Sequence, residues 1–181
     1  MTIAQDARDA TVPPRESWPE PPSQTEAGAL LTDVILTTFR LNARLLEAAQ
    51  DLAANGGLTA ARWQVLGGVL DQPRTVAAVG RRMGMSRQGV QRVADLLVAH
   101  HLAEYRPNPA HRRAKLLACT EAGYWAIRRI SFVAHPFANR IGAQMTTDEV
   151  RHTLTTMQHL VALLEADQPR RRIDAASVRA G

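Results

Sequence analysis

The chain has 181 residues, a formal net charge of +5 and one cysteine, Cys119. This length suits one domain with appendages rather than two full domains, and a single cysteine excludes an internal disulfide. No apolar run approaches the roughly 18 residues that cross a bilayer, and no secretory signal opens the chain, so we expect a cytoplasmic protein without membrane contact. Few aromatic residues and abundant Ala, Leu, Val and Arg favour a mainly helical fold.

The positive charge is concentrated in the middle of the chain. Residues 60–115 hold ten basic residues against three acidic ones, whereas the first fifty residues hold seven acidic residues against four arginines. A localised basic surface is what binding to a polyanion such as nucleic acid requires.

The N-terminal part of the chain divides at about residue 25. Residues 1–25 contain five of the ten prolines and little apolar periodicity, which predicts a flexible arm. From residue 26, Leu, Val and Ile recur at helical spacing until Asn55-Gly56-Gly57, which predicts one long helix.

Three shorter helices are predicted next, each beginning at a hydroxyl side chain that can accept a hydrogen bond from the first turn. Thr59 begins a helix that Pro73 would stop. Thr75 begins a short helix that ends at Gly84, and Ser86 begins a helix that continues to about residue 100. A short helix, a tight turn and a second helix have the spacing of a helix-turn-helix.

The remaining elements are a hairpin and two helices. Residues 102–106 and 114–119 have the composition of short strands, and the Pro-rich segment 107–113 between them predicts a loop with a basic end. Thr120 begins a long helix in which Pro136 predicts a break or kink. Residues 146–149 form a capping box before the last helix.

The helix that begins at Ser86 has the wrong charge in its first turn, because Arg87 lies where the helix dipole is positive. On a helical wheel, Gln88, Gln91, Arg92 and Asp95 share one face, opposite an apolar face. A phosphate or a guanine edge beside Arg87 would offset its electrostatic cost. A solvated helix face is the ordinary alternative, and the basic hairpin directly downstream favours a DNA-binding helix followed by a wing.

This arrangement predicts contacts with double-stranded DNA. Gln88 and Gln91 suit adenine edges or phosphates, and Arg92 suits guanine or phosphate. Asp95 would repel phosphate, so we expect it deeper along the helix or paired with a neighbouring arginine. The complete set of predicted DNA-contacting residues is Thr75, Ser86, Arg87, Gln88, Gln91, Arg92, Arg106, Arg112 and Arg113.

The segments LTAARWQVLGGVL and TVAAVGRRMGMSRQGVQRVADLLVAHHLAEYRPNPAHRRAKLLACTEAG resemble the MarR family of winged helix-turn-helix regulators over residues 58–123. With the flanking helices, about residues 28–166 fit. The resemblance implies a mainly α fold with a small β-hairpin wing. Its implied organisation is a flexible arm (1–25), an N-terminal dimerisation helix (26–56), a winged helix-turn-helix DNA-binding domain (57–119), C-terminal dimerisation helices (120–166) and a flexible basic tail (167–181).

Two positions depart from the family pattern. His111 stands where the family usually has an aspartate two residues before its wing arginine, here Arg113, so wing geometry or pH sensitivity is expected to differ. His101 stands where the family often has glycine between the recognition helix and the first strand, and we expect it to form that corner in some other way.

Other chemistry has weaker support. No phosphate loop, nucleophile elbow or paired-carboxylate motif is present in the sequence, so we expect no enzyme and no cofactor. His100, His101 and His111 lack a ligand cluster, which argues against a metal site, and Cys119 suits a buried structural thiol.

Aromatic residues at helical spacing are most often core residues. Regulators of the resembled family often bind small ligands, and by that resemblance Phe39, Arg40 and Trp63 could instead line a pocket for a small aromatic or anionic effector.

The function that these features favour is a transcriptional regulator, more specifically a repressor. It would act as a homodimer on a pseudo-palindrome with half-sites about one helical turn apart, and ligand binding would change the separation of the two recognition helices. The alternative is a winged-helix module that binds protein partners without specific DNA binding. An enzymatic helical bundle would need a catalytic constellation that the sequence does not provide.

Overall fold

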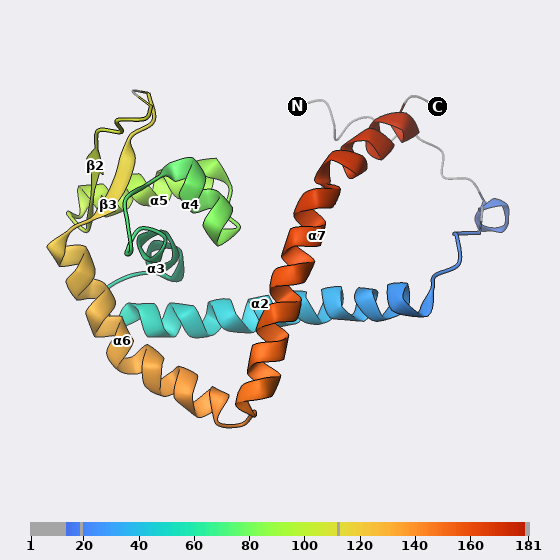
Figure 1. Cartoon of the computed structure of the whole chain (residues 1–181), viewed down its shortest axis with the longest axis horizontal. Coiled ribbons are helices and arrows are strands. Elements are labelled where there is room, and N and C mark those ends of the chain that lie inside the picture. The colour runs from blue at the N-terminus through green and yellow to red at the C-terminus, as the bar shows by residue number, and fades with distance from the viewer. Residues whose placement is uncertain (1–13, 19, 112, 180–181) are drawn as a thin grey trace. The chain divides into compact units, whose positions relative to one another are not determined.

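The computed structural model describes residues 14–18, 20–111 and 113–179, with side chains to residue 167, and divides into two compact units, Met1–Leu45 and Leu46–Gly181 (Figure 1). Along the described residues, none of the helices is both long enough and apolar enough to cross a membrane. The elements in chain order are η1 (Arg15–Ser17), α2 (Glu26–Ala54), α3 (Ala60–Gly67), β1 (Arg74–Thr75), α4 (Val76–Met83), α5 (Arg87–Ala99), β2 (Ala103–Arg106), β3 (Leu116–Cys119), α6 (Glu121–Gly142) and α7 (Thr147–Arg179).

The first unit contains η1 and most of α2. Residues 1–13 of the predicted flexible arm lie outside the described residues, and Arg15–Ser17 form a single turn of 3-10 helix that the sequence pattern did not indicate. At the start of α2, the Thr25 hydroxyl oxygen accepts a hydrogen bond from the Gly28 amide at 3.1 Å. The large apolar side chains of this unit are exposed, Phe39 to 67%.

The predicted helix starts of the second unit are confirmed by their capping hydrogen bonds. In α3, α4, α5 and α6 the side-chain oxygen of the preceding Ser or Thr accepts from the amide three residues on, at 3.0 to 3.3 Å. At α7 the Thr146 hydroxyl accepts from the Glu149 amide, and Glu149 accepts from the Thr146 amide at 2.7 Å. Each cap satisfies an amide that the first helical turn leaves without a partner.

The strands form one antiparallel sheet in the order β1-β3-β2. The predicted hairpin of β2 and β3 is confirmed, with Ala103 opposite Cys119 and Arg106 opposite Leu116. The third strand, β1, was not expected from the sequence, and it pairs Arg74 with Leu117. The fold is thus mainly α with a small β wing, as predicted.

The hydrophobic core lies in the second unit and is built where α3, α4 and α5 meet the sheet (Figure 1). A Cβ added at Gly80 of α4 would lie 2.9 Å from the Met85 carbonyl oxygen, so α4 passes very close to the turn before α5. Fully or nearly fully buried side chains of this core are Val65, Leu66, Val69, Val79, Val90, Ala94, Leu97, Leu117 and Ile130.

Three helices end in the same hydrogen-bonded motif, in which a residue with positive φ follows the helix. Gly57 follows α2 with φ 72°, and Gly84 follows α4 with φ 64°. His101 follows α5 with φ 58°, while the amides of His101 and Leu102 donate to the Val98 and Leu97 carbonyls at 3.0 and 2.9 Å. The expectation that His101 forms this corner in another way is therefore wrong, because it adopts the backbone conformation that glycine would adopt.

The two C-terminal helices differ from their predicted limits. Pro136 lies inside α6, and the helix continues through it to Gly142 instead of breaking. The backbone of α7 continues as helix to Arg179, past the predicted boundary at residue 166, so the predicted tail from 167 is helical over 167–179.

Candidate nucleic-acid interface

The N-terminus of α5 lies directly after the turn of the helix-turn-helix. The Ser86 side chain accepts from the Gly89 amide at 3.0 Å, and the Val90 amide donates to the Ser86 carbonyl. The amides of Arg87 and Gln88 have no acceptor among the described residues. Two free amides and the positive end of the helix dipole make this end suitable for a phosphate group.

One face of α5 is buried in the core and the opposite face is exposed to solvent. Val90, Ala94 and Leu97 are fully buried, as the helical wheel predicted. Arg87, Gln88 and Arg92 are exposed, and within the described part of the chain their side chains form no hydrogen bond and no ion pair. These three predicted residues therefore present unused donors on one helix to the solvent.

The other two polar residues of this face, Gln91 and Asp95, form a hydrogen-bonded trio with Tyr105 of β2. The Gln91 amide nitrogen donates to the Asp95 carboxylate at 2.9 Å and to the Tyr105 hydroxyl oxygen at 2.8 Å. The Tyr105 hydroxyl in turn donates to the same Asp95 oxygen at 2.8 Å. Asp95 was expected to lie deep on the helix or to pair with an arginine. Its partners are instead Gln91 and Tyr105.

Tyr105 was not among the predicted site residues, and it links β2 to α5. Its ring is half-buried and packs against the core. Burial, followed by the hydrogen bond and the negative charge of Asp95, raises the pKa of Tyr105 to about 12. The Lys115 ammonium lies 6.0 Å from the ring centroid. No sequence signal indicates this link, because Tyr105 is fourteen residues from Gln91 and lies in a different element.

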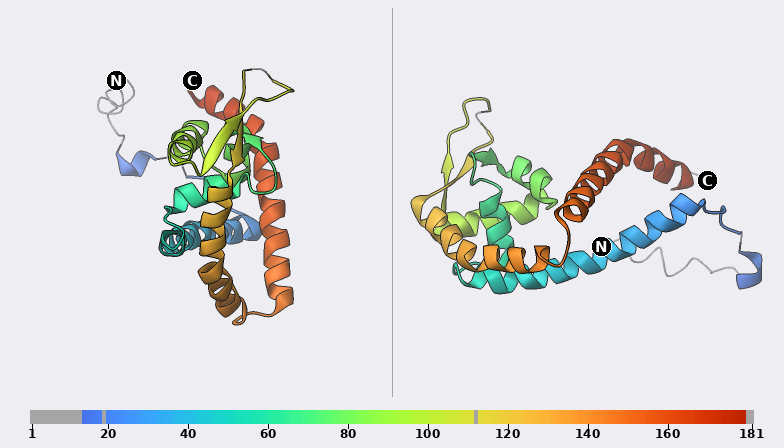
Figure 2. Two further views of the ribbon diagram at one scale, coloured as in Figure 1. Left: turned by 90° about the vertical axis from the view of Figure 1, so that its left-hand side faces the viewer. Right: turned by 60° about the horizontal axis from the view of Figure 1, so that its bottom comes forward.

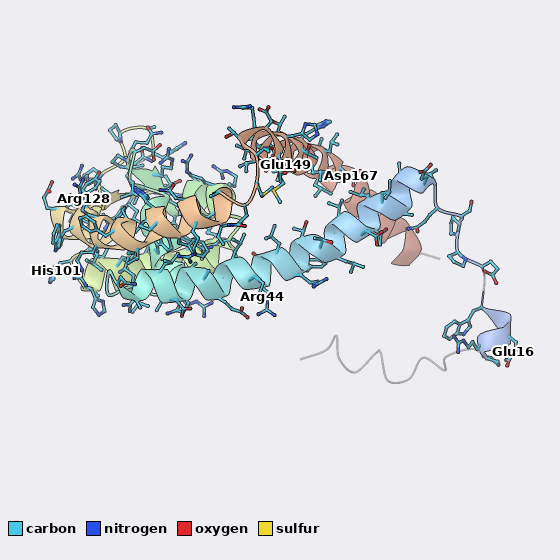
Figure 3. The ribbon with its side chains drawn as sticks, turned by 90° about the horizontal axis from the view of Figure 1, so that it is seen from below. Glu16, Arg44, His101, Arg128, Glu149 and Asp167 are labelled. Atoms are coloured by element: carbon cyan, nitrogen blue, oxygen red, sulfur yellow. The ribbon has the colours of Figure 1, made fainter. Side chains whose placement is uncertain are left out.

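The wing loop joins β2 to β3, and in both views of Figure 2 it extends beyond the sheet, away from α3, α4 and α5. Arg106, at its base, donates to Glu104 at 2.7 Å and forms an ion pair with it, so part of its charge is compensated. Arg113 is exposed in the loop, and Arg112 lies outside the described residues. Within the loop, Asn108 accepts hydrogen bonds from the amides of Ala110 and His111, at 3.0 and 3.2 Å.

Thr75 and Arg81 lie on either end of α4. Thr75 is half-buried and its hydroxyl oxygen accepts from the Ala78 amide at 3.2 Å, so its position serves the start of α4. Arg81 was not predicted as a site residue. It is exposed in the last turn of α4 and lines the same surface hollow, of about 420 Å³, as Arg87. The sequence signal that could have identified Arg81 as a site residue is its position beside the turn of the helix-turn-helix.

The predicted effector residues belong to different units, Phe39 and Arg40 to the first and Trp63 to the second. Trp63 is partly buried against the core of its unit. A pocket that combines them remains a prediction.

The remaining candidates from the sequence are a metal site and the Cys119 thiol. Among the described residues, no cluster of three or more His, Cys, Asp or Glu side chains could hold a metal ion. Cys119 is buried in β3, and burial raises the pKa of its thiol to about 11.

Comparison with known proteins identifies related sequences. A sequence model described as "MarR family" matches residues 56–114. Uncharacterized proteins of Mycobacterium bovis and Mycobacterium tuberculosis are 38% identical to the chain over 144 residues, which cover 80% of this chain and 98% of each relative. The match to these relatives extends well beyond the winged helix.

Solved structures share the fold. The structure of Staphylococcus aureus MarR in complex with salicylate and kanamycin matches with a TM-score of 0.65 at 14% identity, covering 77% of this chain and 95% of that one. The transcriptional repressor CouR bound to a 23-mer DNA duplex matches with a TM-score of 0.59 at 22% identity, covering 77% of this chain and 99% of that one.

Proposed function

This chain belongs to the MarR family of transcription regulators, and from that premise we propose that it is a repressor that binds a pseudo-palindromic DNA site as a homodimer. In this proposal α5 enters the major groove of each half-site and the β2–β3 wing contacts the neighbouring minor groove. The half-sites lie about one helical turn apart, which places the two recognition helices of a two-fold symmetric dimer on the same side of the duplex.

The open face of α5 is the observation that supports DNA binding most strongly. Arg87, Gln88 and Arg92 are exposed and are not engaged by other described side chains, while the opposite face of the same helix is fully buried. Ion pairs with acidic neighbours would be the ordinary way to stabilise arginines on a structural surface. Arginines without such partners suit a polyanion, and Arg87 also lies in the first turn of the helix, at the positive end of its dipole.

Exposed apolar side chains support the homodimer. On α7, Val150, Leu154, Met157, Val161 and Leu164 are spaced alternately by four and three residues, and each is between 39% and 55% exposed. This is the spacing of a coiled-coil seam, which buries such a stripe against another helix. On α6, Trp125 and Phe132 are at least 60% exposed as well, and exposed large apolar side chains of this kind mark surfaces that a partner covers.

Effector control is the third part of the proposal. A small aromatic or anionic molecule would release the repressor from DNA by favouring a dimer with a different separation of its recognition helices. The salicylate in the S. aureus MarR structure supports this chemical class. Salicylate added to the protein–DNA complex is the test, and a complex that salicylate leaves intact would remove this part of the proposal.

The experiment that tests DNA binding is a selection with the full chain from a library of duplexes with a randomised centre, followed by gel-shift titration of the enriched sequence. We expect an enriched motif with two inverted halves and a retarded complex of two chains per duplex. Arg87→Ala and Arg92→Ala should each weaken binding by about 1–3 kcal/mol if they contact bases. Arg151→Ala is the matched control, because Arg151 is an exposed arginine of α7 paired with Asp148.

The opposite outcome would favour the alternative function. A protein that enriches no sequence and forms no complex with duplex at low salt would be a winged-helix module for protein partners. Size-exclusion chromatography with and without a random duplex separates these two functions, since only a DNA-binding protein changes its elution volume.

A further inference from the structure

The hydrogen bonds of the Gln91–Asp95–Tyr105 trio limit what Gln91 can present to DNA. A carboxylate is only an acceptor, so the group of Gln91 that faces Asp95 at 2.9 Å must be its NH2. The Tyr105 hydroxyl donates its single proton to Asp95 and is left to accept from the same NH2 at 2.8 Å. These contacts settle the orientation of the amide.

The carbonyl oxygen of Gln91 is the polar side-chain atom that remains available to contact a base. Gln91 is exposed, and among the described residues no donor reaches its Oε1 atom. A glutamine that recognises adenine with two hydrogen bonds must give its NH2 to adenine N7 while its oxygen accepts from the N6 amino group. Both hydrogens of the Gln91 NH2 are used within the trio, so in this chain that contact would require the NH2 to give up its bond to Asp95 or to Tyr105.

Resting on the proposed DNA-binding function, we propose that Asp95 and Tyr105 position Gln91 as a hydrogen-bond acceptor, so that Gln91 recognises an exocyclic amino group in the major groove. Cytosine N4 and adenine N6 are the two amino groups exposed there. Tyr105 and Asp95 are positioning residues in this scheme, since they act on the base through Gln91. Within the trio, the Asp95 carboxylate accepts two hydrogen bonds, one from Gln91 and one from Tyr105.

The link between α5 and the wing makes Tyr105 the decisive residue. Tyr105 lies in β2, directly before the last residue of the strand, while Gln91 lies in the middle of α5. Removing only its hydroxyl leaves the ring in place against the core and leaves Gln91 with one partner instead of two. The base preference of Gln91 should then weaken without any change in the number of phosphate contacts.

The test is the same duplex selection, carried out with the wild type, Gln91→Ala, Tyr105→Phe and Tyr124→Phe. Tyr124→Phe is the matched control, since the Tyr124 hydroxyl donates to the Leu70 carbonyl at 3.0 Å and takes no part in the Gln91–Asp95–Tyr105 trio. Gln91→Ala identifies the base position that Gln91 contacts. At that position we expect Tyr105→Phe to lower the preference about five- to tenfold, near the lower end for a base contact, and Tyr124→Phe to leave it unchanged.

Modified bases then distinguish a contact with the exocyclic amino group alone from the two-bond contact with adenine N6 and N7. Deleting the exocyclic amino group at the Gln91 position should weaken wild-type binding by a similar factor and leave Gln91→Ala binding unchanged. If the contacted base is adenine, replacing it with 7-deazaadenine should leave wild-type affinity within twofold, because N7 is not contacted. A tenfold loss with 7-deazaadenine would overturn the inference, since it would show the two-bond contact.

The outcomes separate this inference from the proposed function. A wild type that enriches no sequence overturns both. A wild type that enriches a motif whose base preferences are the same in Tyr105→Phe, with that variant melting at the wild-type temperature, overturns the positioning role alone.

Discussion

Replacing Gly123 by alanine should destabilise the protein at the base of the wing, although Gly123 lies in a helix where alanine is intrinsically preferred. It is buried in the first turn of α6, and its amide donates to Thr120 at 3.2 Å. A Cβ added there would lie 2.1 Å from the Leu102 carbonyl oxygen and 2.7 Å from the Cys119 sulfur. The Leu102 oxygen also accepts from the Thr120 amide, so it is not free to move.

The expected destabilisation follows from two opposing effects. Alanine gains up to about 1 kcal/mol over glycine in a helix. Overpacking a filled site costs about 1–3 kcal/mol, and a clash with backbone places Gly123→Ala at or above the upper end of that range. The net loss is about 2 kcal/mol or more, which corresponds to a fall in Tm of about 4–8 °C for a chain of this size.

The assay is thermal unfolding followed by circular dichroism, with all proteins at one concentration because dimerisation stabilises the folded state. Gly67→Ala is the matched control, since Gly67 also lies in a helix and nothing lies within 4 Å of a Cβ added there. We expect that variant to melt at or slightly above the wild-type temperature. A Gly123→Ala variant as stable as the wild type would refute the packing argument.

Three further outcomes are expected. His101→Gly should raise the unfolding free energy by up to about 1 kcal/mol in urea titrations, since glycine adopts φ 58° without strain, and a lower stability would contradict the backbone explanation. Cys119, whose pKa is raised to about 11, should react slowly with iodoacetamide at pH 8 when folded and rapidly in denaturant, and equal rates would show an accessible thiolate. In a Tyr124→Phe background, ultraviolet titration should show Tyr105 ionising near pH 12 in the folded protein. Because the folded state holds this proton more tightly, the contribution of Tyr105 to stability should be complete below pH 10 and should be lost as the pH rises toward 12. A Tyr105→Phe variant with the same loss of stability between pH 10 and 12 would contradict that origin.

Features that depend on adjacent residues could be predicted from the sequence. The helix starts at Thr59, Thr75, Ser86 and Thr120 are set by a side chain and an amide three residues away, and all of them are confirmed. The amphipathic division of α5 is also local, because it follows from helical periodicity.

Features that depend on distant residues could not be predicted in the same way. The two residues of β1 become a strand only because β3, some forty residues later, pairs with them. The orientation of Gln91 depends on Tyr105 in another element. The continuity of α6 through Pro136 excludes the predicted break, and the predicted kink stays a prediction. The helix and the hairpin that carry the predicted site residues could therefore be predicted as elements, while the hydrogen-bond partners of their side chains required the structure.

The salt dependence of binding to the selected duplex tests the central claim most directly. A dimer that neutralises six to ten phosphates should lose about 10³- to 10⁵-fold in affinity between 50 and 200 mM salt, with log K falling linearly against log salt. We predict such a loss for the wild type and a shallower slope for Arg113→Ala, since Arg113 lies exposed in the wing loop. Affinity that is absent, or indifferent to salt, would contradict the assignment of this surface to DNA.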